Sequence, residues 1–169
     1  KRKIEGKDTI IFDSNPEFLR EDHAIEDMLY HDRVVLGVSK PEDCEKLKYL
    51  YQDVLEQSFS APHFLPRPEP IKLPPLIITD PTSAELIKYA ANAFLAMKVS
   101  FINEIACFCE LIGANINDLA DGIGADHRIG REFLEAGIGW GGSCFPKDTA
   151  ALVAMGEELG YQMKLVKAA

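Results

Sequence analysis

The sequence lacks the long hydrophobic run that a membrane-spanning helix needs. No apolar stretch among its 169 residues approaches the roughly 20 residues that cross a bilayer. An excess of positive charge is missing too: 18 Lys and Arg stand against 27 Asp and Glu, which gives a formal net charge of -9. A negative charge of this size repels phosphate backbones, and no local basic stripe offsets it. A membrane span and nucleic-acid binding are therefore excluded.

Cysteine and histidine are scarce, and neither has the spacing of a disulfide framework or a metal site. Cys44, Cys107, Cys109 and Cys144 are irregularly spaced in a chain too large to need disulfides, which favours free thiols in a reducing, cytoplasmic compartment. Cys107 and Cys109 resemble half of a metal site, but in a helical pattern residues two apart point to different faces. The four histidines are scattered singly. We therefore expect no bound metal.

An initiating methionine and a targeting leader are also missing. The chain begins with Lys1, and no charged segment followed by an apolar run comes after it. What is present is typical of a folded protein, because 47% of the residues are hydrophobic and 27% are charged. We therefore expect an excised part of a longer globular protein, with room for one good core.

The first 75 residues predict a small α/β region. Residues 9–12 are a brief apolar run and residues 33–38 are rich in β-branched side chains, so both are typical of strands. Pro41 begins an amphipathic helix that should end near Ser58. These elements indicate the edge of an α/β sheet whose other strands lie elsewhere. Six prolines within residues 62–75 then favour an extended linker; the alternative is a docking site for a proline-recognising module.

A long helix follows, and its sequence is apolar around most of its circumference. It should cover residues 82–112, about 45 Å at roughly 1.5 Å per residue. A helix that is apolar nearly all round must be buried nearly all round, so we expect a homodimer in which a second copy covers part of it. Shorter helices are predicted over residues 115–123, 128–136 and 148–159, with Gly160 as the stop of the last. The predicted fold class is α+β: a sheet edge followed by an all-helical domain built on one long central helix.

The C-terminal third combines a run of glycines with a cysteine. Residues 137–142 match the spacing G-x-G-x-x-G, but no strand precedes them, so we reject a dinucleotide-binding loop. Cys144 instead falls at the start of a helix, where free amides, the helix dipole and the charge of Lys147 would stabilise a thiolate. Asp148 lies one turn later and could share these surroundings. The alternative interpretation is a small buried cysteine in a glycine-rich turn.

Two further pairs of polar residues have helical spacing. Lys88 and Asn92 are one turn apart beside small alanines on the long helix, so they could stabilise a developing oxyanion. The alternative is a lysine that extends to solvent and a packed amide. Glu17 and Glu21 show the same one-turn spacing, which is common at helix starts for dipole reasons alone.

Four segments, in this order, closely resemble the UDP-glucose 6-dehydrogenases. They are residues 14–21 (SNPEFLRE), 32–37 (DRVVLG), 83–94 (SAELIKYAANAF) and 139–148 (GWGGSCFPKD). Residues 126–130 (DHRIG) and the loop 133–137 are more similar to the UDP-glucose branch than to the GDP-mannose branch of the nucleotide-sugar dehydrogenases. The resemblance extends over nearly the whole chain.

This resemblance implies an enzyme of three domains: an NAD-binding Rossmann domain, a central helical domain and a UDP-binding domain. Residues 1–75 would end the first domain and include a proline-rich connection. Residues 76–160 would form the central dimerisation and catalytic domain, and residues 161–169 would start the connection to the third. The Rossmann glycine fingerprint and the third domain are absent from this chain, so we expect it to be inactive alone. Two features depart from the family: the proline-rich connection is longer than usual, and Glu135 replaces a lysine that relatives often carry near the nucleotide phosphates.

The resemblance also implies a reaction and residue roles. The family oxidises the C6 alcohol of UDP-glucose to a carboxylate with two NAD+, without releasing the aldehyde. Cys144 would form a thiohemiacetal and then a thioester. The other catalytic residues would be Lys88, Asn92, Asp148, Glu17 and Glu21. Substrate would be bound by Phe133, Leu134, Gly137, Gly139 and Gly141, with Arg128 reaching into the partner subunit's site. NAD would contact Glu21, Cys144 and Lys147.

Other functions are weighed against this one. The substrate could be another nucleotide sugar, of the GDP-mannose or UDP-N-acetyl-mannosamine type. The chain could also be a dimerisation core without activity of its own. A cysteine hydrolase would need a base near the thiol, and His127 is the one histidine close to Cys144 in sequence.

Overall fold

The computed structural model describes residues 13–169, which divide into two compact units, one ending at Lys88 and one starting at Tyr89. The strand predicted over residues 9–12 lies outside the described residues. Within residues 13–169 no helix is long and apolar enough to cross a membrane. The expected α+β class is confirmed, since the first unit holds a small sheet and the second is helical.

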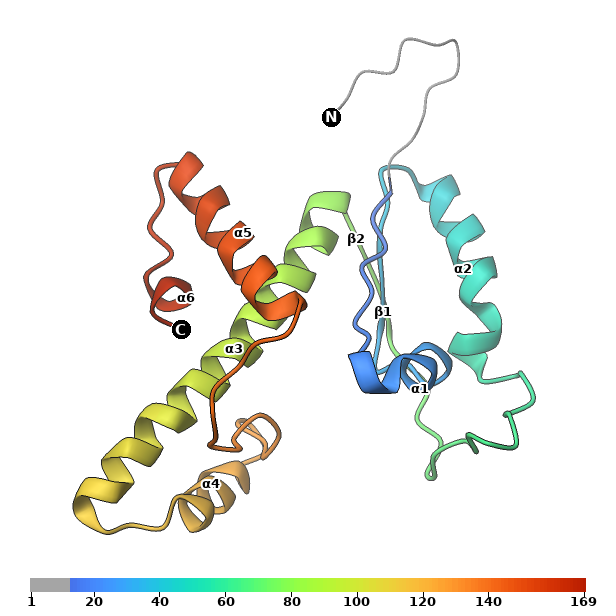
Figure 1. Cartoon of the computed structure of the whole chain (residues 1–169). Helices are drawn as coiled ribbons and strands as arrows, with labels where there is room; N and C mark the ends of the chain where they lie inside the picture. Colours follow the sequence, from blue (N-terminus) through green and yellow to red (C-terminus); the bar gives the residue numbers. More distant parts are fainter. Residues whose placement is uncertain (1–12) are drawn as a thin grey trace. The chain divides into compact units, whose positions relative to one another are not determined.

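A two-stranded parallel sheet is the centre of the first unit (Figure 1). β1 (Val34–Gly37) pairs in parallel with β2 (Leu76–Thr79). All four residues of β1 are buried, as is typical of strands in parallel sheets. Ser14 adds an antiparallel bridge, because its amide and carbonyl bond to Gly37 at 2.8 and 2.7 Å. The sequence analysis predicted β1 but missed β2, although Leu-Ile-Ile-Thr after two prolines is a typical strand sequence.

The helix predicted from Pro41 is confirmed as α2 (Pro41–Glu56). It ends at Gln57, which has the left-handed φ of 52°. The side-chain amide of Gln57 donates to the carbonyls of Leu29 (2.9 Å) and Val54 (2.8 Å), which holds this turn in place. Before β1 the chain forms a single 3-10 turn, η1 (Glu21–His23), and the short α1 (Ala24–Leu29).

The long helix is confirmed as α3 (Pro81–Ile112), 32 residues in one continuous element. Asp80 caps its start, because the Asp80 carboxylate accepts from the Ser83 amide at 3.0 Å and the Ser83 hydroxyl at 2.6 Å. These hydrogen bonds lower the pKa of Asp80. Gly113 ends the helix with a φ of 74°, a conformation that glycine adopts without strain.

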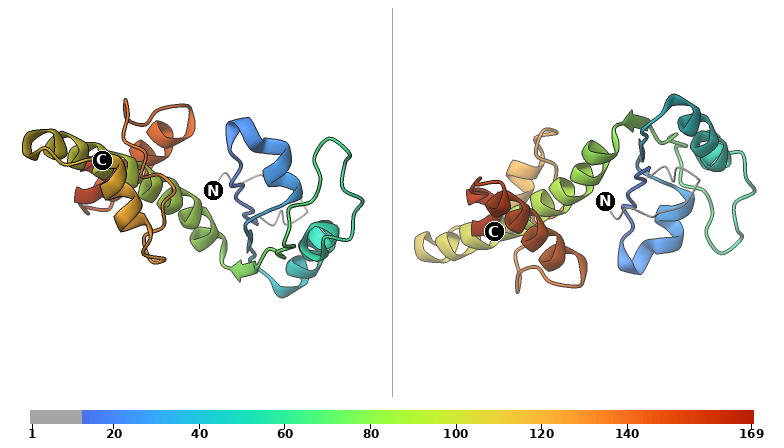
Figure 2. Two further views of the ribbon diagram at one scale, coloured as in Figure 1. Left: turned by 90° about the horizontal axis from the view of Figure 1, so that it is seen from below. Right: turned by 90° about the horizontal axis from the view of Figure 1, so that it is seen from above.

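Three shorter helices complete the second unit: α4 (Ile116–Gly124), α5 (Cys144–Glu158) and α6 (Lys164–Ala168). Figure 2 shows them along α3 from two directions. Ile102 of α3, Ala120 of α4 and Leu134 form a buried hydrophobic cluster, so α4 and the segment after it pack on α3. The predicted helices at 115–123 and 148–159 are confirmed, although α5 begins earlier, at Cys144.

The helix predicted over residues 128–136 is wrong. This segment consists of turns, with positive φ at Gly130 (71°) and Phe133 (64°). A positive φ cannot continue a right-handed helix. Lys98 of α3 also takes up two of the segment's carbonyls, because its Nζ donates to Ile129 (3.1 Å) and Gly130 (3.3 Å). A contact from a distant helix thus overrides the local helical pattern.

Two glycines of α4 offer a test of how this segment is packed. A Cβ at Gly124 would lie 2.8 Å from the Cα of Arg131, whereas a Cβ at Gly122 would meet nothing within 4 Å. We expect Gly124→Ala to lower the free energy of unfolding by about 1–3 kcal/mol because of this overlap. Gly122→Ala should raise it by about 0.5–1 kcal/mol, since alanine loses less backbone entropy in a helix. Urea denaturation followed by circular dichroism measures both, and equal effects would contradict the packing described.

Candidate active site

A buried hydrogen bond joins two of the predicted catalytic residues in the second unit. The Nδ2 of Asn92 on α3 donates to Oδ2 of Asp148 on α5 at 2.6 Å. Asp148 is 2% exposed and Asn92 is 9% exposed. A carboxylate this far from water needs a hydrogen-bond donor, and Asn92 supplies one. Both residues were predicted as site residues, but helical spacing related Asn92 to Lys88 and Asp148 to Cys144.

Cys144 is the first residue of α5, as predicted. Its side chain is partly exposed, in contrast to the buried thiols of Cys44 and Cys109. Cys144 therefore lies at the positive end of the α5 helix dipole. Ser143 lies beside it, with Oγ 3.6 Å from the sulfur.

Lys147 brings a positive charge to the same helix start. Its Nζ lies 3.4 Å from Oδ1 of Asp148, and its side chain is otherwise exposed. The hydrogen bond to Asp148 raises the pKa of Lys147, and the Coulombic attraction of Asp148 adds to the effect. Lys147 is therefore charged at neutral pH, and it can stabilise an anionic group at the beginning of α5.

The glycine-rich segment before α5, residues 137–142, combines positions of positive φ with open positions. Gly139 and Gly142 have φ values of 101° and 78°, which side-chain-bearing residues avoid. A Cβ at Gly137 or Gly141 would meet nothing within 4 Å. Nothing in this unit therefore fills the space beside those two backbones, and a ligand can approach them closely.

Phe133 and Leu134, predicted to bind substrate, have different surroundings. Phe133 has the unusual φ of 64°, and its ring lies 6.2 Å from that of Phe145, next to Cys144. A non-glycine residue at this φ marks local strain, which is common at functional sites. Leu134 is 2% exposed and packs with Ile102. The Leu134 side chain thus belongs to the core, and only its backbone can face a ligand.

The predicted catalytic residues of the first unit are also brought into contact. The Nζ of Lys88, on α3, donates to the Glu17 carbonyl at 2.6 Å and also pairs with the Glu17 carboxylate. Lys88 is mostly buried at this pair, and its ammonium lies 5.7 Å from the centre of the Phe18 ring. The alternative of a lysine extending freely into solvent is therefore wrong.

The helical spacing assumed for Glu17 and Glu21 is wrong. Glu17 lies in an extended segment, and the first helical turn begins only at Glu21. Pro16 precedes Glu17, but no helix starts there because the backbone around Ser14 is already bonded to Gly37 of β1. The one-turn helical spacing therefore does not apply to these two positions.

Arg128, expected to reach a partner subunit, is held by a neighbour in this chain. Its guanidinium donates to Asp126 through Nε and Nη2, and its side chain remains exposed. This pairing lowers the pKa of the Asp126 carboxyl. Glu135, the departure from the family pattern, pairs with Arg131 at 2.9 Å. Its charge is thus opposed by a cation of the same segment.

Ser100 and Asn103, in the middle of α3, contact the glycine-rich segment but were not predicted as site residues. The Trp140 indole donates to the Ser100 hydroxyl at 2.7 Å, and the Gly137 amide donates to Oδ1 of Asn103 at 3.0 Å. The available signal was the presence of two polar residues three positions apart on a mostly apolar helix, the spacing that places side chains on one face.

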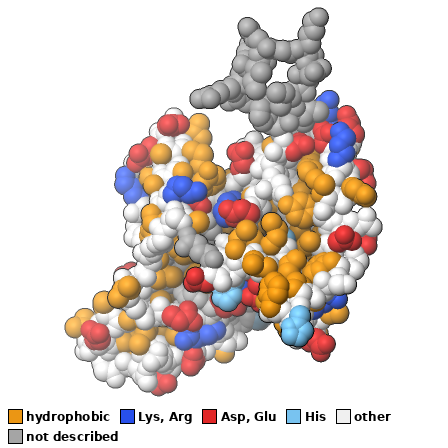
Figure 3. Space-filling model, turned by 45° about the vertical axis from the view of Figure 1, so that its right-hand side comes forward, with side chains coloured by type: hydrophobic (Ala, Val, Ile, Leu, Met, Phe, Trp, Pro, Cys, Tyr) orange, Lys and Arg blue, Asp and Glu red, His pale blue; other side chains and the backbone are white. Residues whose placement is uncertain are grey.

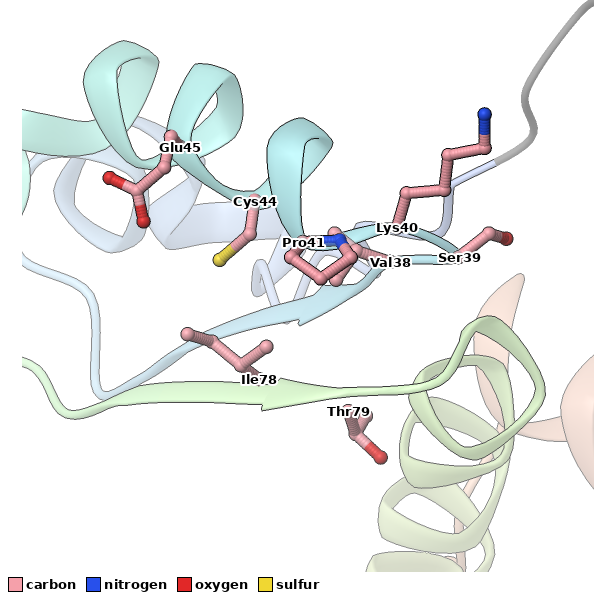
Figure 4. Close-up of a pocket in the computed structure, with 8 residues that line it drawn as sticks. All are labelled: Val38, Ser39, Lys40, Pro41, Cys44, Glu45, Ile78 and Thr79. Carbon is pink, nitrogen blue, oxygen red and sulfur yellow. The ribbon is translucent and has the colours of Figure 1, made fainter.

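A hollow of about 400 Å³ in the first unit lies apart from the predicted residues. It is lined by the ends of β1 and β2 and the start of α2, including Lys40, Cys44 and Thr79 (Figure 4). None of the predicted site residues lines it. No three Cys, His, Asp or Glu side chains in the described part of the chain are grouped to hold a metal ion.

Two domains of one protein family match most of this chain. Residues 82–169 match the central domain of the UDP-glucose/GDP-mannose dehydrogenase family, and residues 2–55 match its NAD binding domain. The chain is 48% identical to a UDP-glucose 6-dehydrogenase from Rickettsia felis over 92% of its own length and 31% of the relative's. For the UDP-glucose 6-dehydrogenase TuaD of Bacillus subtilis the identity is 49%, over 92% of this chain and 30% of the relative. The chain thus spans about a third of these relatives.

Solved structures support the same comparison. A UDP-glucose dehydrogenase from the archaeon Pyrobaculum islandicum superposes with a TM-score of 0.78 at 39% identity, over 92% of this chain and 32% of that one. A GDP-mannose dehydrogenase from Pseudomonas aeruginosa gives a TM-score of 0.56 at 30% identity, over 92% of this chain and 32% of that chain. The chain is therefore more similar to the first structure in both fold and sequence.

The buried pair predicts a stability effect. We expect Asn92→Ala to lower the free energy of unfolding of the chain by about 1–3 kcal/mol, because Asp148 then loses its buried hydrogen-bond donor. Asn92→Asp should cost more, since it places two carboxylates side by side. Asn117→Ala, at an exposed position of α4, is the control and should change little. Urea denaturation provides the measurement, and an Asn92→Ala variant as stable as the control would show that the pair does not form.

Proposed function

Because the chain belongs to the UDP-glucose/GDP-mannose dehydrogenase family, we propose that it is the central part of an NAD-dependent UDP-glucose 6-dehydrogenase. The observation that carries this proposal is the position of Cys144 at the first residue of α5, in sequence and space beside Lys147 and the buried Asp148–Asn92 pair. The higher similarity to UDP-glucose dehydrogenases than to a GDP-mannose dehydrogenase supports the choice of sugar nucleotide.

Cys144 would act as the nucleophile. Loss of a hydride from the C6 alcohol would give the aldehyde, to which the Cys144 sulfur would add to form a thiohemiacetal. Loss of a second hydride would leave a thioester, and water would hydrolyse it to the carboxylate and release the cysteine. Cys144 lies at the positive end of the α5 dipole, and Lys147 places a positive charge at the same helix start. A covalent intermediate of this kind also keeps the aldehyde from leaving the enzyme.

The two polar pairs would handle the charges that develop on oxygen. Asn92 is oriented by its hydrogen bond to Asp148, so its amide geometry is set before substrate binds, as oxyanion stabilisation requires. Asp148 would assist proton transfer through water. Lys88 would supply a positive charge, with Glu17 as its ion-pair partner, and Glu17 or Glu21 would help to activate the hydrolytic water.

The sugar nucleotide would lie against the backbone of the glycine-rich segment. Gly137 and Gly141 have open space where a side chain would be, and Phe133 and Gly139 have positive φ values, which turn the backbone sharply. Leu134 would contribute its backbone alone. Arg128 would bind substrate in the site of a partner subunit, and for this its guanidinium must leave the Asp126 carboxylate.

NAD is the cofactor of the family domain that residues 2–55 match. The parallel β1–α2–β2 unit is of the kind from which dinucleotide-binding domains are built. The exposed, charged Lys147 fits an anionic cofactor group, and we also assign Glu21 and Cys144 to NAD binding. When bound, NAD accepts the hydride removed from the substrate carbon.

We also propose the domain limits and the homodimer. Residues 1–75 would complete the NAD-binding domain, residues 76–160 form the central domain, and residues 161–169 lead to the UDP-binding domain. Phe94, Phe101 and Phe108 of α3 are 61%, 51% and 56% exposed. They are seven residues apart, so they lie on one face of the helix. Covering this face with the same face of a second copy would bury both at once.

The first unit also exposes hydrophobic side chains, and these support its assignment as part of a larger sheet domain. Ile77 and Ile78 of β2 are 39% and 47% exposed. Figure 3 shows hydrophobic side chains gathered over one face of this unit. Exposed hydrophobic patches of this kind mark surfaces that other parts of a protein cover.

The nucleophile can be tested in the full-length protein. We expect Cys144→Ser to lower kcat for NADH formation from UDP-glucose by at least about 10³-fold, because a hydroxyl without an activating base is a poor nucleophile. The dissociation constant of UDP-glucose, from calorimetry, should stay nearly unchanged. Cys107→Ser, at an exposed thiol of α3, is the matched control and should keep full activity. Retained turnover in Cys144→Ser would refute the covalent mechanism.

The dimer can be tested by light scattering. We expect the chain to be a dimer at tens of micromolar, about the concentration at which a modest interface is populated, and Phe101→Glu to make it monomeric. Leu159→Glu changes an equally hydrophobic side chain that is 85% exposed on the second unit, and it should leave the dimer intact. A well-folded monomeric wild-type chain at that concentration would exclude an α3 interface.

A further inference from the structure

Two side chains on one face of α3, Ser100 and Asn103, bind the glycine-rich segment at Trp140 and at Gly137. The Ser100 hydroxyl accepts from Nε1 of Trp140 at 2.7 Å. Oδ1 of Asn103 accepts from the amide of Gly137 at 3.0 Å. The acceptors and the donors are each three positions apart, so a single helix turn contacts the segment twice.

Each acceptor is oriented by a second hydrogen bond. The Ser100 hydroxyl donates its proton to the carbonyl of Ala169 at 2.7 Å, which leaves its lone pairs for Trp140. Nδ2 of Asn103 donates to the Val99 carbonyl one turn earlier at 2.8 Å, which turns Oδ1 toward Gly137. Both groups are thus set in position by the protein before any ligand arrives.

Few other contacts can order this segment. Glycines fill four of the six positions from 137 to 142, and glycine has the greatest backbone freedom to lose on ordering. Ile138 is fully exposed. Trp140 is the one side chain of the segment that is partly buried, and its ring meets Phe145 edge-on at 6.3 Å.

We infer that Ser100 and Asn103 are positioning residues that hold the backbone of Gly137 to Trp140 in its substrate-binding conformation. This inference rests on the proposed function, in which this backbone lines the sugar-nucleotide pocket. Neither residue touches the reacting carbon in this scheme. They act by raising the fraction of molecules whose segment is ordered, and a smaller fraction raises the apparent dissociation constant in proportion.

Kinetics of the full-length protein distinguish positioning from a general structural role. Ser100→Ala and Trp140→Phe each remove the same hydrogen bond, and each should raise the KM for UDP-glucose about five-fold, as expected for one neutral hydrogen bond. The KM for NAD and the kcat should stay within about two-fold, because Cys144 is untouched. Asn103→Ala should give the same split, and Ser100→Thr, which keeps the hydroxyl, should restore the KM.

A double-mutant cycle tests the hydrogen bond itself. Ser100→Ala combined with Trp140→Phe should raise the KM about five-fold and not about 25-fold, because the second change removes nothing further. Cys107→Ala, an exposed α3 position seven residues from Ser100, is the control and should leave every constant unchanged. Multiplicative effects, or a loss of kcat parallel to a drop in melting temperature, would overturn the inference.

A spectroscopic readout separates this inference from the proposed function. Trp140 is the one tryptophan of the 169-residue sequence, and 5-fluorotryptophan labelling gives it a fluorine resonance that Trp140→Phe identifies by its loss. Ser100→Ala should shift or broaden this resonance, and Ser100→Thr should not. An unchanged resonance in Ser100→Ala overturns the inference even if the enzyme oxidises UDP-glucose. If the wild-type enzyme does not oxidise UDP-glucose, the proposed function fails while the resonance still decides the positioning role.

Discussion

The buried hydrogen bond between Asn92 and Asp148 is the constraint on which the second unit depends. A carboxylate that is 2% exposed has lost almost all of its water, and this loss is unfavourable unless a donor replaces it. The donor comes from α3, so α5 can dock only where Asp148 meets Asn92. Cys144, four residues before Asp148 on the same helix, is placed by that docking. A buried polar contact thus fixes the position of the candidate nucleophile.

The helix α3 serves as the support for most of the candidate site. It is largely apolar, and yet several of its polar side chains contact other parts of the chain. Lys98 binds two carbonyls of the turn before Arg131, and Asn103 binds the amide of Gly137. Regular helices are rigid, whereas glycine-rich segments are not. Attaching the flexible segment to the rigid helix supplies the order that its own sequence cannot provide.

The second unit has both a buried hydrophobic cluster and exposed aromatic side chains on α3. The small cluster of Ile102, Ala120 and Leu134 is fully buried, while Phe101, next to Ile102 on the same helix, stays half exposed. Burial of a large aromatic side chain is worth about 1.5–3 kcal/mol, which is a sizeable part of a domain's stability. The exposed apolar face of α3 therefore supports the proposed dimer.

Local sequence patterns were enough to predict helices α2 and α3 and a helix start at Cys144, because prolines, caps and apolar periodicity act within a few residues. Residue type and spacing made Cys144, Lys88, Asn92 and Asp148 candidates, and the resemblance to the UDP-glucose 6-dehydrogenases predicted their roles. Only the tertiary structure paired Asn92 with Asp148, 56 positions away, and Lys88 with Glu17, 71 positions away. The same holds for the failed helix over residues 128–136, where Lys98 takes carbonyls that a helix would use. Helical spacing relates neighbours in sequence, whereas these contacts depend on how distant segments pack, which no local pattern encodes.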